Sequence, residues 1–350
     1  MKKILTTILV ILFCSRYSAD VAAQTLEDPG TYMNAIVNAH DEMNKKYMTY
    51  VSAAAHGRRA RKVEKLRQQV LESITNSRYK TIELPIYKGD NSLRQSSMDY
   101  IQLCYNVFNE DYSKIVNTEE IAEQSFDQMQ AFILLQEKTG EKLEEASKKM
   151  HTASLAFAAK YKVTIVNGPK DELSEKMGVA GKLNHYKNQV YLLFFKCNWQ
   201  DGEITKAINE KKVKDLEQSR NALIAYANEG LKILDTTKSF EGDMTLANAC
   251  RQALSFYKKT GENDIPKTID YFLKQENFEK MSKAFEAKSE SSRTREDVDN
   301  YNKAVKEINT AVNNYNQSIN QNNKARSEML ENWTNTENAF SNTHMPYYKG

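Results

Sequence analysis

Proline and glycine are scarce in this sequence, with five prolines and twelve glycines among 350 residues. Both residues interrupt regular structure, so their scarcity excludes a fold built from many short elements and tight turns. Strand-like alternation of apolar and polar residues is almost absent as well. The sequence therefore favours long helices with few breaks.

Cysteine is rare too, and no pair has the spacing of a metal site or a CxxC motif. Besides Cys14, the chain contains Cys104, Cys197 and Cys250. Three thiols allow at most one disulfide within a chain, and their connectivity stays open. Alternatively, at least one of these cysteines is simply a small buried residue.

Catalytic and cofactor motifs are also missing. The sequence has no HExxH, GxSxG, P-loop or Gly-rich dinucleotide turn. Its five histidines are scattered along the chain: His40, His56, His151, His185 and His344. Adjacent acidic residues such as Glu119 and Glu120 point in different directions on a helix, so we expect no carboxylate pair in a cleft. We therefore predict no catalytic, cofactor-binding or metal-ligating residues and a chain that is not an enzyme.

The sequence has no apolar run long enough to span a membrane. The run from Ile4 to Phe13 follows two lysines and precedes Val21-Ala22-Ala23, which is typical of a bacterial secretory signal peptide cleaved after Ala23. A lipoprotein signal would acylate Cys14, but it needs a small residue where Phe13 stands. We expect export to the periplasm, the outer membrane or the cell surface, without lipidation.

The exported part of the chain has no large excess of positive or negative charge. Removal of residues 1–23 takes away three basic residues and one acidic residue, which lowers the formal net charge from +3 to +1. A nearly neutral exported chain is a poor candidate for nucleic-acid binding, so we expect no nucleic-acid partner.

Apolar residues at helical spacing are what the sequence has in abundance. The first stripe runs from Ile36 to Ala54 and slips near Gly57, which indicates either one long helix with a phase change or two helices meeting there. Further helices are expected from about Ser92 and Asn117. The run "VYLLFFKC" at 190–197 is apolar on every side, which predicts a helix segment enclosed by its neighbours.

The last helix has the clearest pattern. Its apolar positions alternate steps of three and four: Val298, Tyr301, Val305, Ile308, Val312, Tyr315 and Ile319. This spacing is a heptad seam, typical of coiled coils. Asn322 and Arg326 then weaken the seam before Met329 and Trp333 resume it.

The chain contains similar stretches about 153 residues apart. The sequence "YKGDNSL" at 87–93 resembles "FEGDMTL" at 240–246, and weaker matches keep nearly the same offset on both sides. We therefore predict a signal peptide at 1–23, a first three-helix repeat at 24–166, and a second at 167–350 that includes the long C-terminal helix.

The shared turn suggests structural roles for four residues. Gly89 and Gly242 can supply the positive φ that a sharp reversal needs. Asp90 and Asp243 can cap the helix that follows.

Basic residues cluster in "AAAHGRRARKVEKLRQ" at 53–68. Four of them lie within one arc of a helical wheel, opposite the apolar side: Arg58, Arg61, Lys62 and Lys65. At the offset of about 153 residues, the basic cluster corresponds to Lys211, Lys212 and Lys214 in the second repeat. A plain solvated face is the simpler interpretation, and contact with an anionic lipid headgroup or an envelope polysaccharide is the alternative.

Three stretches resemble a poorly characterised family of bacterial exported surface proteins: "AAAHGRRARKVEKLRQQVLESI", "YKGDNSLRQSSMDYIQLCYNVFNEDYSKIVNTEEIAEQ" and "LLQEKTGEKLEEASKK". The resemblance covers mainly the first repeat. It implies an envelope or surface location and a helical fold, and it assigns no functional residues.

The sequence predicts an all-α, elongated helical bundle with long coiled-coil-like helices, built from two copies of a three-helix unit. We expect a non-enzymatic envelope or surface protein that presents long helix faces to a partner, such as another envelope protein. The alternative is a binding protein that encloses an apolar or amphipathic small molecule between the two repeats.

Overall fold

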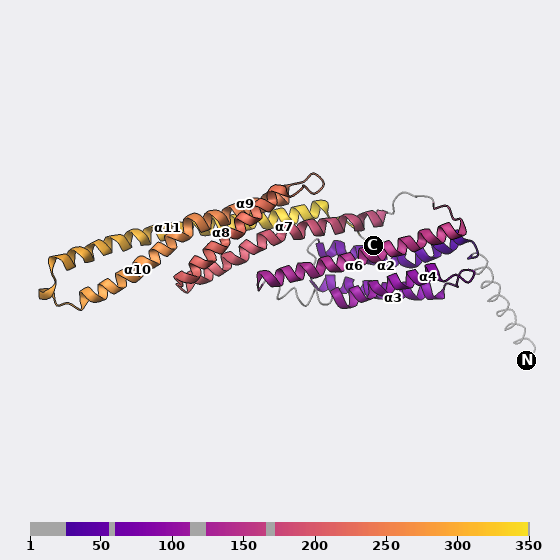
Figure 1. The fold of residues 1–350 in the computed structure, drawn as a ribbon, viewed down its shortest axis with the longest axis horizontal. Helices are drawn as coiled ribbons and strands as arrows, with labels where there is room; N and C mark the ends of the chain where they lie inside the picture. Colours follow the sequence, from indigo (N-terminus) through magenta and orange to yellow (C-terminus); the bar gives the residue numbers. More distant parts are fainter. Residues whose placement is uncertain (1–25, 56–59, 113–123, 166–171, 349–350) are drawn as a thin grey trace, which may run out of the picture. The chain divides into compact units, whose positions relative to one another are not determined.

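The structure is a computed structural model, and it describes residues 26–55, 60–112, 124–165 and 172–348. Helices make up its regular elements (Figure 1), and the residues within these ranges form no strand beyond two isolated bridges at turns. The all-helical bundle predicted from the sequence is confirmed. No helix in these ranges is long and apolar enough to cross a membrane.

The chain divides into two compact units. Among the described residues, the first unit comprises 26–55, 60–112, 131–165, 172–182 and 345–348, and the second comprises 124–130 and 183–344. The division at 182/183 falls inside a helix, whereas the sequence analysis places a boundary at 166/167. A helix gives no sequence signal where its packing partners change, because its periodicity continues across that point.

Four long helices make up the described part of the first unit: α2 (Pro29–Ala55), α3 (Ala60–Glu83), α4 (Ser92–Asn106) and, from Ala131 onward, α6 (Phe126–Tyr161). Helices α2 and α3 pack against each other, with the Lys80 ammonium of α3 3.3 Å from Glu42 of α2, so they are separate helices, which decides between the two interpretations of the slip near Gly57. The described part of the unit accordingly has four long helices, whereas the sequence predicts a three-helix repeat. The helix expected from Asn117 begins, in the described residues, at Phe126.

The start of α2 follows the rules for a helix N-terminus. Asp28 precedes the helix and accepts the backbone N–H of Thr31 at 2.7 Å, which satisfies a donor that has no partner within the helix. Pro29 occupies the first helical position, where its missing N–H costs nothing.

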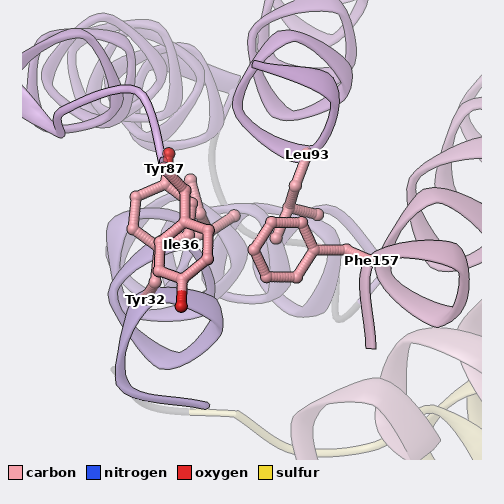
Figure 2. Packing of buried hydrophobic residues seen from close by; sticks show 5 residues of the cluster. All are labelled: Tyr32, Ile36, Tyr87, Leu93 and Phe157. Atoms are coloured by element: carbon pink, nitrogen blue, oxygen red, sulfur yellow. The ribbon is translucent and has the colours of Figure 1, made fainter. Parts of the chain in front are cut away.

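An aromatic cluster forms part of the core of the first unit. Five buried side chains compose it: Tyr32, Ile36, Tyr87, Leu93 and Phe157 (Figure 2). The ring of Tyr32 lies 5.0 Å from that of Tyr87 and 5.8 Å from that of Phe157. Hydroxyl groups at the edge bond to backbone, with Tyr32 donating to Pro85 O and Tyr87 to Glu27 O. The cluster therefore ties α2, α4, α6 and the turn after α3 together.

The second unit contains the C-terminal part of α7 (Glu172–Asn209) and four further helices: α8 (Val213–Thr236), α9 (Thr245–Lys259), α10 (Ile265–Glu286) and α11 (Arg295–His344). The apolar run at 190–197 lies in α7, and Val190, Phe194 and Cys197 are buried there. The ring of Phe194 stacks on Trp333 of α11 at 4.2 Å between centroids. The run is therefore enclosed by neighbouring helices.

Three consecutive elements have the same lengths in both units. Helices α3 and α8 have 24 residues each, and α4 and α9 have 15 each. A five-residue π-helix follows in both units, η1 (Val107–Asp111) and η2 (Thr260–Asp264). Every one of these pairs is offset by 153 residues.

Each π-helix accepts a hydrogen bond from an arginine of the helix two before it, α3 for η1 and α8 for η2. A π-turn widens the helix and disturbs its regular hydrogen bonding. Arg67 of α3 donates to the carbonyl of Phe108 at 2.8 Å, and Arg220 of α8 donates to the carbonyl of Gly261 at 2.8 Å. In both units, a carbonyl of the π-helix thus accepts a hydrogen bond from a charged arginine side chain.

Candidate functional site

The most exposed apolar packing in the second unit lies in the hairpin of α10 and the first part of α11, which we define as residues 265–308. Figure 1 shows α10 and α11 running together past the ends of α7 and α8. At the base of this hairpin, Phe272 and Ile308 are buried. None of residues 273–307, all of which the structure describes, is buried. Over this length, the ring contacts of α10 are with α11, through Phe278, Phe285 and Tyr301.

Aromatic side chains nevertheless form the seam of the hairpin. Tyr301 of α11 stacks on Phe285 of α10 at 4.4 Å and lies 5.9 Å from Phe278. The Arg293 guanidinium lies over the ring of Phe285, 4.4 Å from its centroid. A two-helix contact cannot enclose these rings, because helices pack on only one side of each other. The seam is therefore half-buried throughout.

Other apolar side chains of the hairpin face water more fully. The exposed fractions are 45% for Leu273, 38% for Met281 and 39% for Val298. The hairpin also carries nine basic and nine acidic residues, counted over 265–308, so its formal net charge is zero. Exposed apolar groups along a balanced charged surface are characteristic of a protein interface more than of an anion or nucleic-acid site.

The basic cluster of the first unit is described only in part. Arg58 and the side chain of Arg61 lie outside the described portion of the chain. Lys62 and Lys65 are exposed on α3. The structure therefore places two of the four predicted residues on a solvated helix face.

The second basic group lies at the turn between α7 and α8. Lys211, Lys212 and Lys214 are exposed, and the Lys212 ammonium pairs with Glu210 at 2.7 Å. Beside them is an open depression of about 260 Å³, lined in part by Lys212. Its charged lining comprises Glu203, Lys206, Glu210, Lys212 and Asp215, so acidic groups balance the lysines.

The first predicted turn is held by its aspartate. Gly89 has φ of 80° and Lys88 has φ of 46°, both in the left-handed region. The carboxylate of Asp90 accepts the Ser92 N–H at 2.9 Å and bonds to Lys160 at 2.7 Å and Tyr161 at 3.0 Å. The Lys160 ammonium holds the pKa of the Asp90 carboxyl well below its usual range. Asp90 thus joins the start of α4 to the end of α6.

The second turn repeats this backbone with a different partner. Gly242 has φ of 89° and Glu241 has φ of 50°. Asp243 accepts the Thr245 N–H at 2.7 Å and contacts His344 Nε2 at 2.8 Å. Partial burial raises the pKa of the Asp243 carboxyl, but hydrogen bonds from His344 and Thr245 outweigh it and hold the pKa below its usual range.

Two polar residues of the last helix make buried contacts that the sequence analysis misses. Arg326 binds both carboxylate oxygens of Asp201 on α7, at 2.7 and 3.0 Å, and the Asp201 side chain is only 6% exposed. Asn322 donates to the hydroxyl of Thr260 at 2.8 Å and to Asp264 at 3.2 Å. These residues do not weaken the seam: they fix which turn of α11 faces α7 and η2. Polar residues in step with a heptad are the signal that could have revealed them.

A buried histidine lies in the first unit. His40 Nε2 is 2.7 Å from the Ser97 hydroxyl, and its ring lies 5.3 Å from that of Tyr100. Burial lowers the pKa of His40 to about 4. Ser97 is fully buried, so no substrate could reach this pair without opening the core.

The remaining chemistry-bearing groups are dispersed. Cys104, Cys197 and Cys250 are free and buried, and burial raises the pKa of the Cys104 and Cys197 thiols to about 12. A thiol of that kind is a poor nucleophile. Among the side chains that the structure describes, no group of three or more His, Cys, Asp and Glu residues could hold a metal ion.

Comparison of the chain with protein family models, with curated proteins and with solved structures found no match. The resemblance to exported surface proteins therefore stays a prediction. Functional conclusions rest on the geometry of the hairpin and of the two units.

Proposed function

We propose that this chain is a non-enzymatic, exported envelope or surface protein that acts as an interaction module by presenting long helix faces to a partner. The observation that carries the proposal is the hairpin 265–308, in which no residue between 273 and 307 is buried although the seam is aromatic. Such a surface gains free energy when another surface covers it.

The free energy gained by covering the exposed apolar surface of the hairpin supports an interaction role. Exposed apolar area contributes about 25 cal/mol per Å² when it is removed from water. Leu273, Met281 and Val298 alone leave roughly 40% of their surfaces exposed. An antiparallel pair of helices of this length is marginal in water without further packing.

The proposed partner is another protein surface of the envelope. The balanced charge of the hairpin gives no basis for nucleic-acid binding. Contact of the basic residues with lipid headgroups or envelope polysaccharide is a separate proposal. The ion pair of Lys212 with Glu210 weakens the case for the second basic group.

Export is part of this proposal, and residues 1–25 lie outside the described residues. Denatured mass spectrometry of the protein from its own host tests it. We expect a chain that begins at Gln24, whereas an intact Met1 would contradict export and an acyl group on Cys14 would contradict ordinary cleavage. Native mass spectrometry of the same sample tests the alternative function, because a retained small molecule would favour the binding protein.

We also propose that the two units are copies of one ancestral unit. The equal lengths of α3 and α8 and of α4 and α9, at one offset, support this. The left-handed turns before α4 and α9 and the arginine at each π-helix support it as well.

Site-specific photo-crosslinking in the host envelope tests the interaction role. A photoreactive residue at Met281 should form discrete adducts with another polypeptide chain. The same residue at Ile233 of α8, which is 44% exposed in the same unit, is the matched control and should form none. Absence of adducts at Met281, or equal adducts at both positions, would contradict the proposed function.

A further inference from the structure

We infer that the hairpin 265–308 is a self-association surface, and that its partner is the hairpin of a second copy of this chain. This inference rests on the proposed function and specifies its partner. Two hairpins placed face to face supply four helices around one seam, which is the arrangement of a four-helix bundle and encloses a core.

The second unit already shows this solution elsewhere along its length. Where α7 and α8 accompany α9 and α11, side chains such as Leu223, Ala227 and Leu254 are fully buried. Beyond that point α10 and α11 continue as a pair, and the deepest apolar side chains become half-buried. The hairpin thus lacks two helices relative to the rest of its own unit, and a second hairpin provides two.

The charge pattern of the hairpin fits a copy of itself. Along α10, four basic and four acidic residues are interspersed, from Lys267 and Asp270 to Lys283 and Glu286. A surface with a large excess of one sign repels its copy, whereas a neutral and interspersed surface meets opposite charges when it is rotated by a twofold axis. A strongly anionic or cationic partner would be matched by an excess of the opposite sign, which the hairpin does not have.

The dimensions also suit a dimer. The 22 residues of α10 span about 33 Å, and two packed helices are about 20 Å wide, so the flat face measures about 650 Å². Side-chain relief increases the accessible area above that value. A stable interface of ordinary size buries about 800 Å² on each partner, which the face can approach.

Sedimentation velocity of the full purified chain tests the inference over about 1–100 μM. We expect a concentration-dependent monomer–dimer equilibrium. Replacement Met281→Glu places a charge on the exposed apolar surface of the hairpin, and it should weaken dimerisation roughly tenfold or more. Because Met281 is 38% exposed, the far-UV circular dichroism of the variant should match that of the natural chain.

Two control variants locate the surface. Ile233→Glu on α8 and Val37→Glu on α2 change side chains that are 44% and 62% exposed. Both should leave the dimer unchanged. Equal weakening by either control would overturn the assignment to the hairpin, and a chain that stays monomeric at the highest concentration would overturn self-association altogether.

The outcome is distinguishable from failure of the proposed function. A monomeric chain that still forms adducts at Met281 with a different envelope protein would overturn this inference and leave the interaction role standing. A monomeric chain without such adducts would overturn both.

Discussion

The two units share a backbone plan and differ in the chemistry of their interiors. In both units a left-handed turn precedes a 15-residue helix and a π-helix. The first unit buries a histidine at Ser97, whereas the position 153 residues later is Cys250, whose thiol contacts the carbonyl of Val190. The second unit instead buries the ion pair of Asp201 and Arg326.

This difference shows which features the plan requires. The turn glycines, the π-helices and their arginines recur, so the connection of the helices depends on them. The pair of His40 with Ser97 and the pair of Asp201 with Arg326 do not recur at the 153-residue offset, so at these places each unit specifies its own packing. The units should therefore respond differently to pH and to substitution, and they should respond alike at the turns.

We expect the largest difference in stability between the units from a substitution at Arg326. Replacement Arg326→Leu leaves the carboxylate of Asp201 buried without its partner, which should lower the free energy of unfolding of the second unit by about 3–5 kcal/mol. Urea titration followed by tryptophan fluorescence measures this directly, because Trp199 and Trp333 both lie in the second unit.

Two further variants sharpen the result. Arg295 forms a long contact with Asp299 and is 96% exposed, so Arg295→Leu should cost less than about 0.5 kcal/mol. The double replacement of Asp201 and Arg326 by leucine should recover most of the loss, because no unpaired charge remains. Equal effects of the two single arginine variants would show that the buried pair does not stabilise this unit.

The second largest expected effect is a dependence of stability on pH in the first unit, caused by His40. The neutral form of His40 is favoured by burial, with a pKa of about 4 against about 6.5 in an unfolded chain. Its stabilisation is therefore complete above pH 6.5 and is lost as pH falls towards 4, by about 2–3 kcal/mol between pH 7 and 4.5. Urea titration followed by far-UV circular dichroism should show this loss in the first unit.

The replacement His40→Gln is the control for the pH effect. It removes the titrating group and retains a hydrogen-bonding partner for Ser97, so the dependence on pH between 7 and 4.5 should flatten. The tryptophan-detected transition of the second unit should not show the loss caused by His40. An unchanged pH dependence in the variant would exclude His40 as its source.

A smaller effect compares the two turn aspartates. Asp90 has donors from Ser92, Lys160 and Tyr161, whereas Asp243 has Thr245 and His344. Asp90→Asn should therefore cost about 1–2 kcal/mol, and Asp243→Asn should cost less. Thermal unfolding of both variants at pH 7 checks the order, and the reverse order would contradict the assigned partners.

The smallest effect is expected from exchanging the charged turn residues, and it should be the same in both units. Lys88 and Glu241 hold nearly the same positive φ in the two turns. The exchange Lys88→Glu with Glu241→Lys should change the free energy of unfolding by less than about 0.5 kcal/mol in each unit, because exposed charges contribute little. A shift above about 1 kcal/mol in one unit alone would show that the turns are not interchangeable.

Local sequence predicts the helices of this protein well, because period and breakers are local signals. The stripe from Ile36, the start near Ser92 and the enclosed run in α7 all correspond to helices. The roles of Asn322 and Arg326 could not be predicted in the same way. Their partners Asp264 and Asp201 lie 58 and 125 residues away, so only the packed structure brings the charges together.

The same limit applies to the candidate surface. The heptad seam of the last helix is visible in the sequence, but its pattern does not report how many helices cover it. Tyr301 and Ile308 look equivalent as seam residues, yet the structure leaves Tyr301 half-buried and buries Ile308. Burial depends on where the neighbouring helices end, which is a property of the whole unit.

The unbroken length of α11 has a mechanical consequence. Its 50 residues span about 75 Å, and it contacts Phe285 through Tyr301 near one end and Asp243 through His344 at the other. Consecutive hydrogen-bonded turns resist twisting, so a rotation imposed on α11 at the hairpin carries Phe340 and His344 around with it. Under the docking proposed for the hairpin, a force on that end of α11 would reach the contact of His344 with Asp243 at the other end.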